Sequence, residues 1–295
     1  MSRASQLLRY VWKHPSNRGR RVRACVRLAA WQIWKRATGR PWDVRLSGGT
    51  KLKCYPDSTS ASAALYASGR PDYHEMGLME HYLRPGDEFV DVGANVGVYT
   101  LLAGSLVGPC GRVDAVEPGA RAVERLRENV ERNRLTQVHV HVVAATASDG
   151  PVRFQDAADT MNRLIPGKVG TEGVTVAGVK LDDLLSGREP AMGKMDIEGA
   201  ELFALQGAEG LVARQIPPVW LLEINGCLRG YGLTEEALAG WLRARAYELG
   251  SYDADRRVFR LGGTPWKESD NVVALARSRL DHILARTGAS IVEIA

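Results

Sequence analysis

A seven-residue stretch, DVGANVG, ends an apolar run and contains the first residues suited to ligand binding. Gly93 and Gly97 lack a Cβ atom, so a ligand can approach the backbone and a helix can pack closely on a strand. Asp91 ends the preceding run, and Asn95 stands where the dinucleotide-binding GxGxxG pattern has its second glycine. A pyrophosphate would meet this side chain. The stretch therefore favours a nucleoside ligand without phosphate.

A second acid, Glu117, follows at the end of the next apolar run, RVDAVEP, twenty residues beyond Gly97. An acid at the tip of a second parallel strand, about 20 residues after such a turn, is placed to accept both hydroxyls of a ribose. A phosphate-free adenosine ligand with a zwitterionic tail beside Asp91 is S-adenosylmethionine. The predicted cofactor is thus S-adenosylmethionine, and the predicted cofactor-binding residues are Asp91, Gly93, Asn95, Gly97 and Glu117.

Four further polar residues come in two pairs, in the segments KMDIEGAE and LLEIN. Asp196 and Glu198 are two residues apart, as are Glu223 and Asn225, so each pair shares one side of an extended segment. Ligands of parallel sheets bind beyond the carboxyl ends of the strands. An alcohol that accepts a methyl group must lose its proton, and a carboxylate with a raised pKa can take it. We expect Asp196 to be the base, Glu198 and Glu223 to orient the acceptor or share that role, and Asn225 to donate a hydrogen bond.

Two other interpretations of these acids remain open. Glu198 and Glu201 could cap the following helix, because acids stabilise helix N-termini. Asp196, Glu223 and Asn225 supply three oxygen ligands, which would suit a magnesium ion holding a substrate diol. A divalent metal is therefore an alternative, but it is not expected.

The elements that must position these residues alternate between short apolar runs and helical stretches. The predicted strands are residues 88–92, 112–116, 138–143, 193–197, 219–225 and 271–276, and the predicted helices are 97–106, 119–133, 200–213 and 234–245. Alternating strands and crossover helices require an α/β fold with a doubly wound, mostly parallel, Rossmann-like sheet. Residues 151–178 are rich in glycine and break this rhythm, which indicates an inserted hairpin or loop.

An N-terminal extension, residues 1–75, precedes the main domain, residues 76–295. It begins with a basic helix and continues with a small hairpin over residues 43–60. The expected apolar stripe of the helix consists of Val22, Val26, Ala29, Ala30 and Ile33, with Trp31 and Trp34 at its edge. Eleven of the 39 Lys and Arg residues lie in residues 1–42, which contain no acid. We expect this arm to cover the body, with contact to anionic lipid or to RNA as alternatives.

The sequence resembles the FkbM family of class I methyltransferases. The resemblance spans about residues 66–276 and is carried by LRPGDEFVDVGANVGVYTLLAG, VEPGARAVERLRENVERN, VKLDDLL, GKMDIEGAELFALQGA and LLEIN. It implies S-adenosylmethionine-dependent O-methylation of a small hydroxylated molecule such as a sugar, glycoside, polyketide or other secondary metabolite. One departure is Ala144-Ala145-Thr146-Ala147, where such proteins often have A-x-S-D. This difference affects the expected adenine contact.

Two other functions compete with this interpretation. A nucleic-acid methyltransferase could use the basic arm, but enzymes that methylate exocyclic amines commonly carry an Asn/Asp-Pro-Pro-aromatic turn where this chain has DIEG. No nucleic-acid partner is therefore expected. An inactive cofactor-binding adaptor is opposed by the intact Asp91, Gly93, Gly97 and Glu117.

The remaining features concern the setting of the protein. The four cysteines show no CxxC spacing, and no apolar stretch reaches the roughly 18 residues of a membrane span. These features predict a cytoplasmic enzyme. Peripheral membrane contact through the basic arm and a homodimer are left open.

Overall fold

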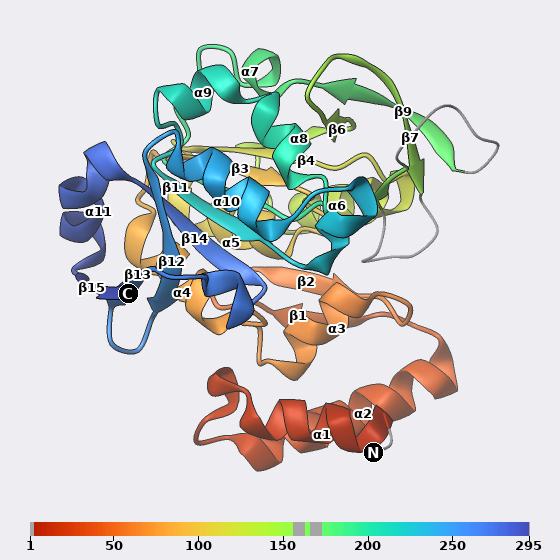
Figure 1. Ribbon diagram of the computed structural model, residues 1–295. Coiled ribbons are helices and arrows are strands. Elements are labelled where there is room, and N and C mark those ends of the chain that lie inside the picture. Colours follow the sequence, from red (N-terminus) through yellow and green to blue (C-terminus); the bar gives the residue numbers. More distant parts are fainter. Residues whose placement is uncertain (1–2, 156–162, 166–172, 295) are drawn as a thin grey trace.

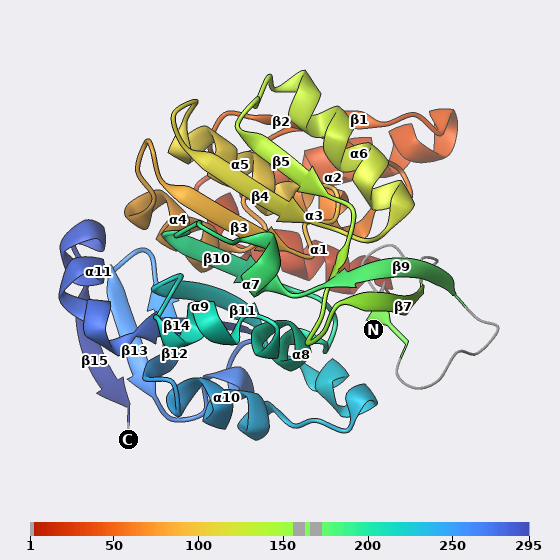
Figure 2. The same ribbon diagram turned by 90° about the horizontal axis from the view of Figure 1, so that it is seen from above.

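A nine-stranded sheet forms the centre of the computed structural model, which describes residues 3–155, 163–165 and 173–294. The strand order is β15-β13-β12-β14-β11-β10-β3-β4-β5. The strands are β3 (Glu88–Val92), β4 (Arg112–Val116), β5 (Val138–His141), β10 (Met192–Met195), β11 (Val219–Glu223), β12 (Tyr247–Asp253), β13 (Val258–Gly262), β14 (Asn271–Ala276) and β15 (Ser290–Ile294). The five strands from β5 to β11 are parallel, and β14 runs antiparallel to both β11 and β12 (Figure 2). The predicted Rossmann-like α/β fold is confirmed.

Helices cover both faces of this sheet, as a doubly wound fold requires. They are α5 (Val98–Val107), α6 (Ala120–Arg132), α7 (Leu181–Leu184), α8 (Glu201–Gln206), α9 (Glu209–Ala213), α10 (Glu235–Arg243) and α11 (Leu280–Thr287). Successive residues of β3 serve opposite faces: Phe89 packs in the cluster that includes α5, whereas Val90 packs in the cluster that includes α8 and α10. Burial on both faces explains why these strands are apolar runs without alternation.

Three strands, and the division of one helix into two, were not predicted from the sequence. Strands β12, β13 and β15 extend the sheet beyond β14, and the predicted helix over residues 200–213 is two helices, α8 and α9, separated at Gly207. A Cβ atom on Gly207 would lie 2.0 Å from the Thr146 carbonyl oxygen, so this close contact requires glycine. The segment YELGSYD of β12 mixes polar and apolar residues, and its strand conformation is fixed by pairing with β13 and β14.

The N-terminal extension consists of helices and one hairpin. Its elements are α1 (Arg3–Lys13), a 3₁₀ turn η1 (Pro15–Asn17), α2 (Arg21–Thr38), β1 (Trp42–Arg45), β2 (Lys51–Cys54) and α3 (Thr59–Tyr66). Helix α4 (Tyr73–Tyr82) crosses the predicted boundary at residue 75 and leads into the main domain. The pairing of β1 with β2 confirms the predicted hairpin. In Figure 1, α1 and α2 form the outermost layer on the side of the sheet that carries α3 and α4. Within the described residues, no helix is both long and apolar enough to cross a bilayer.

The predicted apolar stripe of α2 faces the wrong way. Val22, Val26 and Ile33 are 69%, 62% and 67% exposed, whereas the opposite face, with Leu28 and Trp31, is buried against the body. The sequence places apolar residues on both faces of α2, and the face with the large indole ring removes more apolar area from water when it packs. The predicted stripe therefore exists, but it points to solvent.

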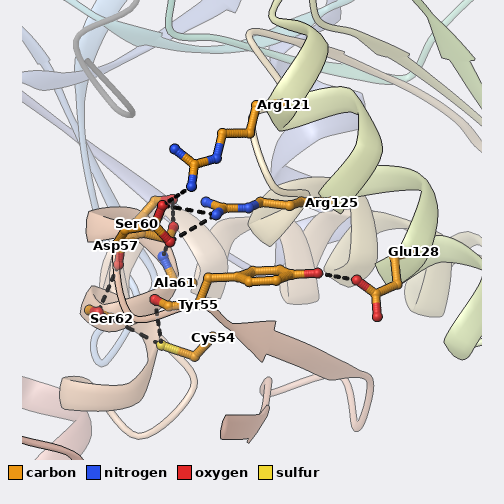
Figure 3. A network of polar contacts seen from close by, with 10 residues as sticks. Cys54, Tyr55, Asp57, Ser60, Ala61, Ser62, Arg121, Arg125 and Glu128 are labelled. Atoms are coloured by element: carbon orange, nitrogen blue, oxygen red, sulfur yellow. Dashed lines mark hydrogen bonds and ion pairs between the residues drawn. The ribbon is translucent and has the colours of Figure 1, made fainter. Parts of the chain in front are cut away.

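A group of polar contacts fixes the extension to α6 (Figure 3). Asp57, between β2 and α3, forms ion pairs with Arg121 and Arg125, the latter at 2.8 Å. The Arg125 guanidinium lies 4.1 Å from the centre of the Tyr55 ring, and the Tyr55 hydroxyl donates a hydrogen bond to Glu128. Because the Arg125 side chain is largely buried, water screens its contacts with Asp57 and Tyr55 less than it screens the exposed Arg121–Asp57 pair. They hold the extension beside the helix that follows Glu117.

The predicted insertion contains a hairpin. Strands β7 (Gly150–Gln155) and β9 (Val174–Val179) pair antiparallel, and β6 (Ala144–Ala145) and β8 (Arg163–Leu164) complete a small second sheet. The remainder of the insertion, residues 156–162 and 166–172, lies outside the described residues. In Figure 2 the two longer strands extend to one side of the main sheet, next to the ends of the parallel strands.

Candidate active site

A cavity of about 360 Å³ lies at the carboxyl ends of β3, β4, β10 and β11. This volume is in the range of small-molecule sites, roughly 300–1,000 Å³. Side chains from the strand ends share its wall with the extension and the insertion. The lining includes Ser60, Ala63, Pro71 and Asp72 of the extension, Phe154 and Leu164 of the insertion, Ala144 and Ala145, and Asp91, Gly93, Asn95, Tyr99, Glu117, Lys194, Asp196, Glu198 and Glu223. The structure thus brings together all the predicted cofactor residues except Gly97, which is the N-cap residue of α5.

The two glycines of DVGANVG have packing roles that the sequence only partly indicates. Gly93 has φ +85°, and a Cβ atom there would lie 1.9 Å from the Asp196 carbonyl oxygen. Gly97 has φ +96°, and its Cβ atom would lie 2.7 Å from Leu126 of α6. Asn95 also has a positive φ, +48°, which asparagine tolerates better than most residues. Gly93 is therefore required by the neighbouring strand end, in addition to any approach of a ligand.

Glu117 is buried, and backbone N–H groups hold its carboxylate. Its Oε2 accepts a hydrogen bond from the Asn95 N–H at 2.9 Å, and its Oε1 accepts one from the Gly119 N–H at 2.8 Å. The carboxylate lies in the cavity wall with a fixed direction, as an acid that binds ribose hydroxyls requires.

Asp91 lies at the buried end of β3. The Thr100 hydroxyl donates a hydrogen bond of 2.5 Å to its Oδ2. Burial raises the pKa of Asp91 to about 6, although this hydrogen bond and the nearby Lys194 charge oppose the increase. Asp91 is therefore mainly ionised at neutral pH and can pair with an ammonium group.

Lys194 is a site residue that the sequence analysis missed. It is buried within β10, and its Nζ lies 3.2 Å from Asp196 Oδ2 and 5.1 Å from the centre of the Tyr99 ring. Burial opposes its charge, but Asp196, Glu223, Asp72 and other nearby acids outweigh burial and raise the pKa of Lys194. A lysine inside the apolar strand MGKM was the available signal, because buried lysines are rare unless paired.

Asp196 and Glu223 form a carboxyl pair with opposite pKa shifts. Burial works against ionisation of Asp196, but Lys194 and a hydrogen bond with Glu223 outweigh it and lower the pKa of Asp196. Burial and the Asp196 charge raise the pKa of Glu223 to about 10. The pair therefore holds one proton at neutral pH, on Glu223. From the sequence we expected a raised pKa at Asp196, but its pKa is lowered instead.

Hydrogen bonds also fix the positions of the polar residues around this pair. Asn225 Nδ2 donates to Glu223 Oε2 at 3.1 Å, and its Oδ1 accepts from the Cys227 N–H at 2.9 Å, so Asn225 orients Glu223 from behind. Glu198 lines the cavity with φ +55° and accepts a hydrogen bond from Cys227 Sγ at 3.4 Å. Glu201 Oε1 instead accepts from the N–H groups of residues 197 and 199, at 3.0 and 3.2 Å. Glu201 lies in the first turn of α8 but bonds the loop before the helix, so it does not cap the N–H groups of α8 as one interpretation held.

The extension contributes Asp72, which the sequence analysis also missed. Asp72 Oδ2 accepts a hydrogen bond of 2.8 Å from the Tyr99 hydroxyl, and burial raises the pKa of Asp72. The adjacent Tyr73 and His74 do not face the cavity: the Tyr73 hydroxyl bonds Asp255 at 2.6 Å, and His74 Nδ1 accepts from the Ala254 N–H. Nothing in the segment PDYHE sets Asp72 apart from its neighbours as a site residue; only its tertiary contacts do.

Three carboxylates could in principle hold a metal ion. One oxygen each of Asp196, Glu198 and Glu223 lies within 4.8 Å of the others. The Lys194 ammonium, 3.2 Å from Asp196 Oδ2, competes with a divalent cation for this set. Asn225, the third ligand of the sequence-based alternative, is occupied by Glu223 and Cys227.

The strand order and the acidic cavity at the strand ends define a class I methyltransferase. Residues 91–249, more than half of the chain, match the family model described as the methyltransferase FkbM domain. The chain belongs to the FkbM methyltransferase family. The resemblance found in the sequence is confirmed.

Individual relatives are more distant. A probable cobalt-precorrin-6B C(15)-methyltransferase (decarboxylating) of Sulfurisphaera tokodaii is 31% identical over 88 residues, 30% of this chain and 46% of the relative. Its counterpart in Sulfolobus acidocaldarius is 44% identical over 55 residues, 19% and 29% of the respective chains. The matches span less than half the length of these relatives. Among solved structures, a methyltransferase FkbM from Methylobacillus flagellatus KT has 16% identity and a TM-score of 0.45, covering 85% of this chain and 59% of its own.

The cofactor of this methyltransferase family is S-adenosylmethionine. The residues present fit it, because the described wall offers carboxylates for a sulfonium, an ammonium and two ribose hydroxyls. The described residues at the glycine turn provide no Lys or Arg for a pyrophosphate. Asp91, Asn95 and Glu117 would hold the cofactor at the ends of β3 and β4.

Proposed function

We propose that the protein is an O-methyltransferase that acts on a hydroxyl of a small, uncharged or cationic molecule. The observation that carries the proposal is Asp196, an ionised carboxylate in the cavity wall between Lys194 and Glu223. A methyl acceptor needs a base in this position. Family membership supports the methyl transfer itself.

Asp196 acts as the base in this mechanism. The acceptor oxygen forms its bond to the methyl carbon while the bond from carbon to sulfur breaks, and the hydroxyl proton passes to Asp196. Glu223, which is protonated, donates a hydrogen bond to Asp196 and keeps the second carboxylate neutral. Lys194 holds Asp196 in place. Alignment of donor and acceptor can supply on the order of 7 kcal/mol or more of the barrier reduction, so the fixed position of Asp196 matters as much as its basicity.

The charge of the cavity indicates the class of acceptor. Among the described lining residues there are six carboxyl groups, Asp72, Asp91, Glu117, Asp196, Glu198 and Glu223, and one cation, Lys194. Such a wall repels phosphates and carboxylates. The extension and the insertion supply the rest of the wall, and their side chains Ala63, Phe154 and Leu164 suit an apolar part of an acceptor. A sugar, glycoside or polyketide hydroxyl satisfies both conditions, whereas a nucleic acid does not.

The proposal includes transfer without a metal, because Lys194 takes the place of a cation beside Asp196. Activity that survives a chelator supports this part. Full loss with EDTA and recovery with magnesium would refute it.

The test combines an acceptor screen with two isosteric variants. Labelled S-adenosylmethionine is incubated with panels of neutral hydroxylated compounds, and products are identified by the added methyl group. Asp196→Asn should lower kcat by about 100-fold or more while cofactor affinity changes little, since general bases contribute 10²–10⁴-fold. Glu223→Gln should have a smaller effect. Glu236→Gln, at an exposed site on α10, is the matched control.

The two variants also separate the proposal from its alternatives. If Asp196→Asn retains full kcat, the base assignment fails. If only RNA or DNA becomes methylated, the acceptor class is wrong. Absence of S-adenosylmethionine binding would favour an inactive adaptor.

A further inference from the structure

The outward face of α2 is unusually apolar for a protein surface. Seven of the exposed large apolar side chains in the described residues lie in the arm, and four lie elsewhere. Those of the arm are Leu8, Tyr10, Trp12, Val22, Val26, Ile33 and Trp34. Val22, Val26 and Ile33 are spaced by four and seven residues, so they form one stripe, with exposed Ala29 and Ala37 on the same face. By the helical rise of 1.5 Å, this stripe is about 17 Å long.

An arginine-lined cavity lies on one flank of the same helix. It has a volume of about 370 Å³ between α2 and β1, and Arg20, Arg23, Arg27 and Arg45 contribute to its wall. The single acid in this wall, Asp43, is paired with Arg132 of α6 at 2.6 Å. The cavity therefore carries a net positive charge that the described residues leave uncompensated.

Arg27 shows the effect of this excess charge. Its Nη2 donates to the Ser68 hydroxyl at 2.6 Å, whereas its buried Nε has no hydrogen-bond partner among the described residues. Burial and the charges of Arg23 and Arg20 lower the pKa of Arg27. Like charges gathered without a counterion are costly, and an anion in this cavity would relieve the cost.

We propose that α2 docks on an anionic lipid surface. The stripe of Val22, Val26 and Ile33 enters the boundary between headgroups and acyl chains, and the arginine-lined cavity receives a lipid phosphate. Helices with one apolar and one arginine-rich side bind membranes in this orientation. A second copy of the chain fits less well, because two arms with eleven cations and no acid would repel each other. RNA would use the arginines but leave the apolar stripe in water.

The position of the arm supports this orientation. Figure 1 shows α1 and α2 side by side as an outer layer, with the sheet on their other side. The arm is firmly attached: Asn17 donates to the carbonyls of Val11 and Tyr66 at 2.8 and 2.9 Å, and His14 Nε2 lies 2.8 Å from the Pro71 carbonyl. Pro71 also lines the active-site cavity. Docking would therefore bring the acceptor side of that cavity close to the membrane.

The experiment is co-sedimentation of the full chain with vesicles. One set contains phosphatidylcholine alone, and the other contains added phosphatidylserine. We expect binding to the anionic set only, weakened by high salt. The triple change Val22→Ser, Val26→Ser and Ile33→Ser should lower the partition coefficient at least about tenfold. Arg20→Gln with Arg23→Gln should lower it by about fivefold per arginine.

Matched controls and contrary outcomes complete the test. Val142→Ser, Val292→Ser and Ile294→Ser remove exposed apolar side chains outside the arm and should leave vesicle binding unchanged. S-adenosylmethionine affinity, which should be equal in all variants, shows that each is folded. Absence of vesicle binding, or binding that the stripe variant retains in full, overturns the proposal. Concentration-dependent dimers or RNA binding in place of vesicle binding would also overturn it, by identifying another occupant.

Discussion

Replacement of Glu117 tests the cofactor assignment most directly. In Glu117→Ala the ribose hydroxyls lose a charged acceptor, and hydrogen bonds to charged groups contribute about 1.5–3 kcal/mol each. Two such bonds give a loss of about 3 kcal/mol at the lower limit, which corresponds to about a 150-fold higher Kd. The backbone donors of Asn95 and Gly119 also lose their partner, so the variant should unfold at a lower temperature.

The measurement is isothermal titration calorimetry with S-adenosylmethionine, accompanied by thermal unfolding of the free proteins. Glu117→Gln keeps one acceptor oxygen, so only one of the two backbone donors retains its partner and the other faces an amide NH2 group. This variant should lose part of the stability that Glu117→Ala loses, and its cofactor affinity should fall by about tenfold or more. Glu124→Ala, at an exposed site on α6, the helix that follows Glu117, is the control. If Glu117→Gln binds the cofactor as tightly as wild type, the assignment of this carboxylate to the ribose is refuted.

Three further predictions rest on individual contacts. Gly93→Ala places a Cβ atom 1.9 Å from the Asp196 carbonyl and should abolish cofactor binding in calorimetry, whereas Gly49→Ala, with a similar φ of +85° and open space around it, should bind normally. The cofactor affinity of the wild type should fall as the pH drops through about 6, because Asp91 becomes protonated. Asp91→Asn should bind the cofactor weakly, with an affinity that does not change between pH 5 and 8. An unchanged wild-type affinity at pH 5 would argue against the Asp91 contact. Asn17→Ala leaves the carbonyls of Val11 and Tyr66 without their donor, so it should lower the free energy of unfolding by about 2 kcal/mol in urea titrations. Equal stability of the variant and the wild type would show that the arm is not integral to the fold.

Local patterns were enough to predict the parallel half of the sheet. Strands β3, β4, β10 and β11 are buried on both faces, so they must be apolar runs, and such runs are visible without any knowledge of neighbours. Strands β12, β13 and β15 belong to the part of the sheet whose segments mix polar and apolar residues. Their conformation depends on pairing partners that are distant in the sequence.

The arm shows a different reason for a wrong prediction. Periodicity identified the stripe of Val22, Val26 and Ile33 correctly, but α2 has a second apolar side with Leu28 and Trp31. Periodicity gives the angular position of a stripe and not the identity of what covers it. The body of the protein packs against the side with Leu28 and Trp31 instead.

By itself, the sequence determined the Rossmann-like fold, the cofactor and the residues at the strand ends, because glycines, acids and apolar runs there follow fixed spacings along the chain. Only the tertiary structure decided which carboxyl group is ionised. Lys194 and Glu223 approach Asp196 across neighbouring strands, and their charge and hydrogen bond outweigh burial for Asp196 while burial prevails for Glu223. Asp72 likewise joins the site only through folding of the extension onto α5, since its Tyr99 partner is 27 residues away in the sequence.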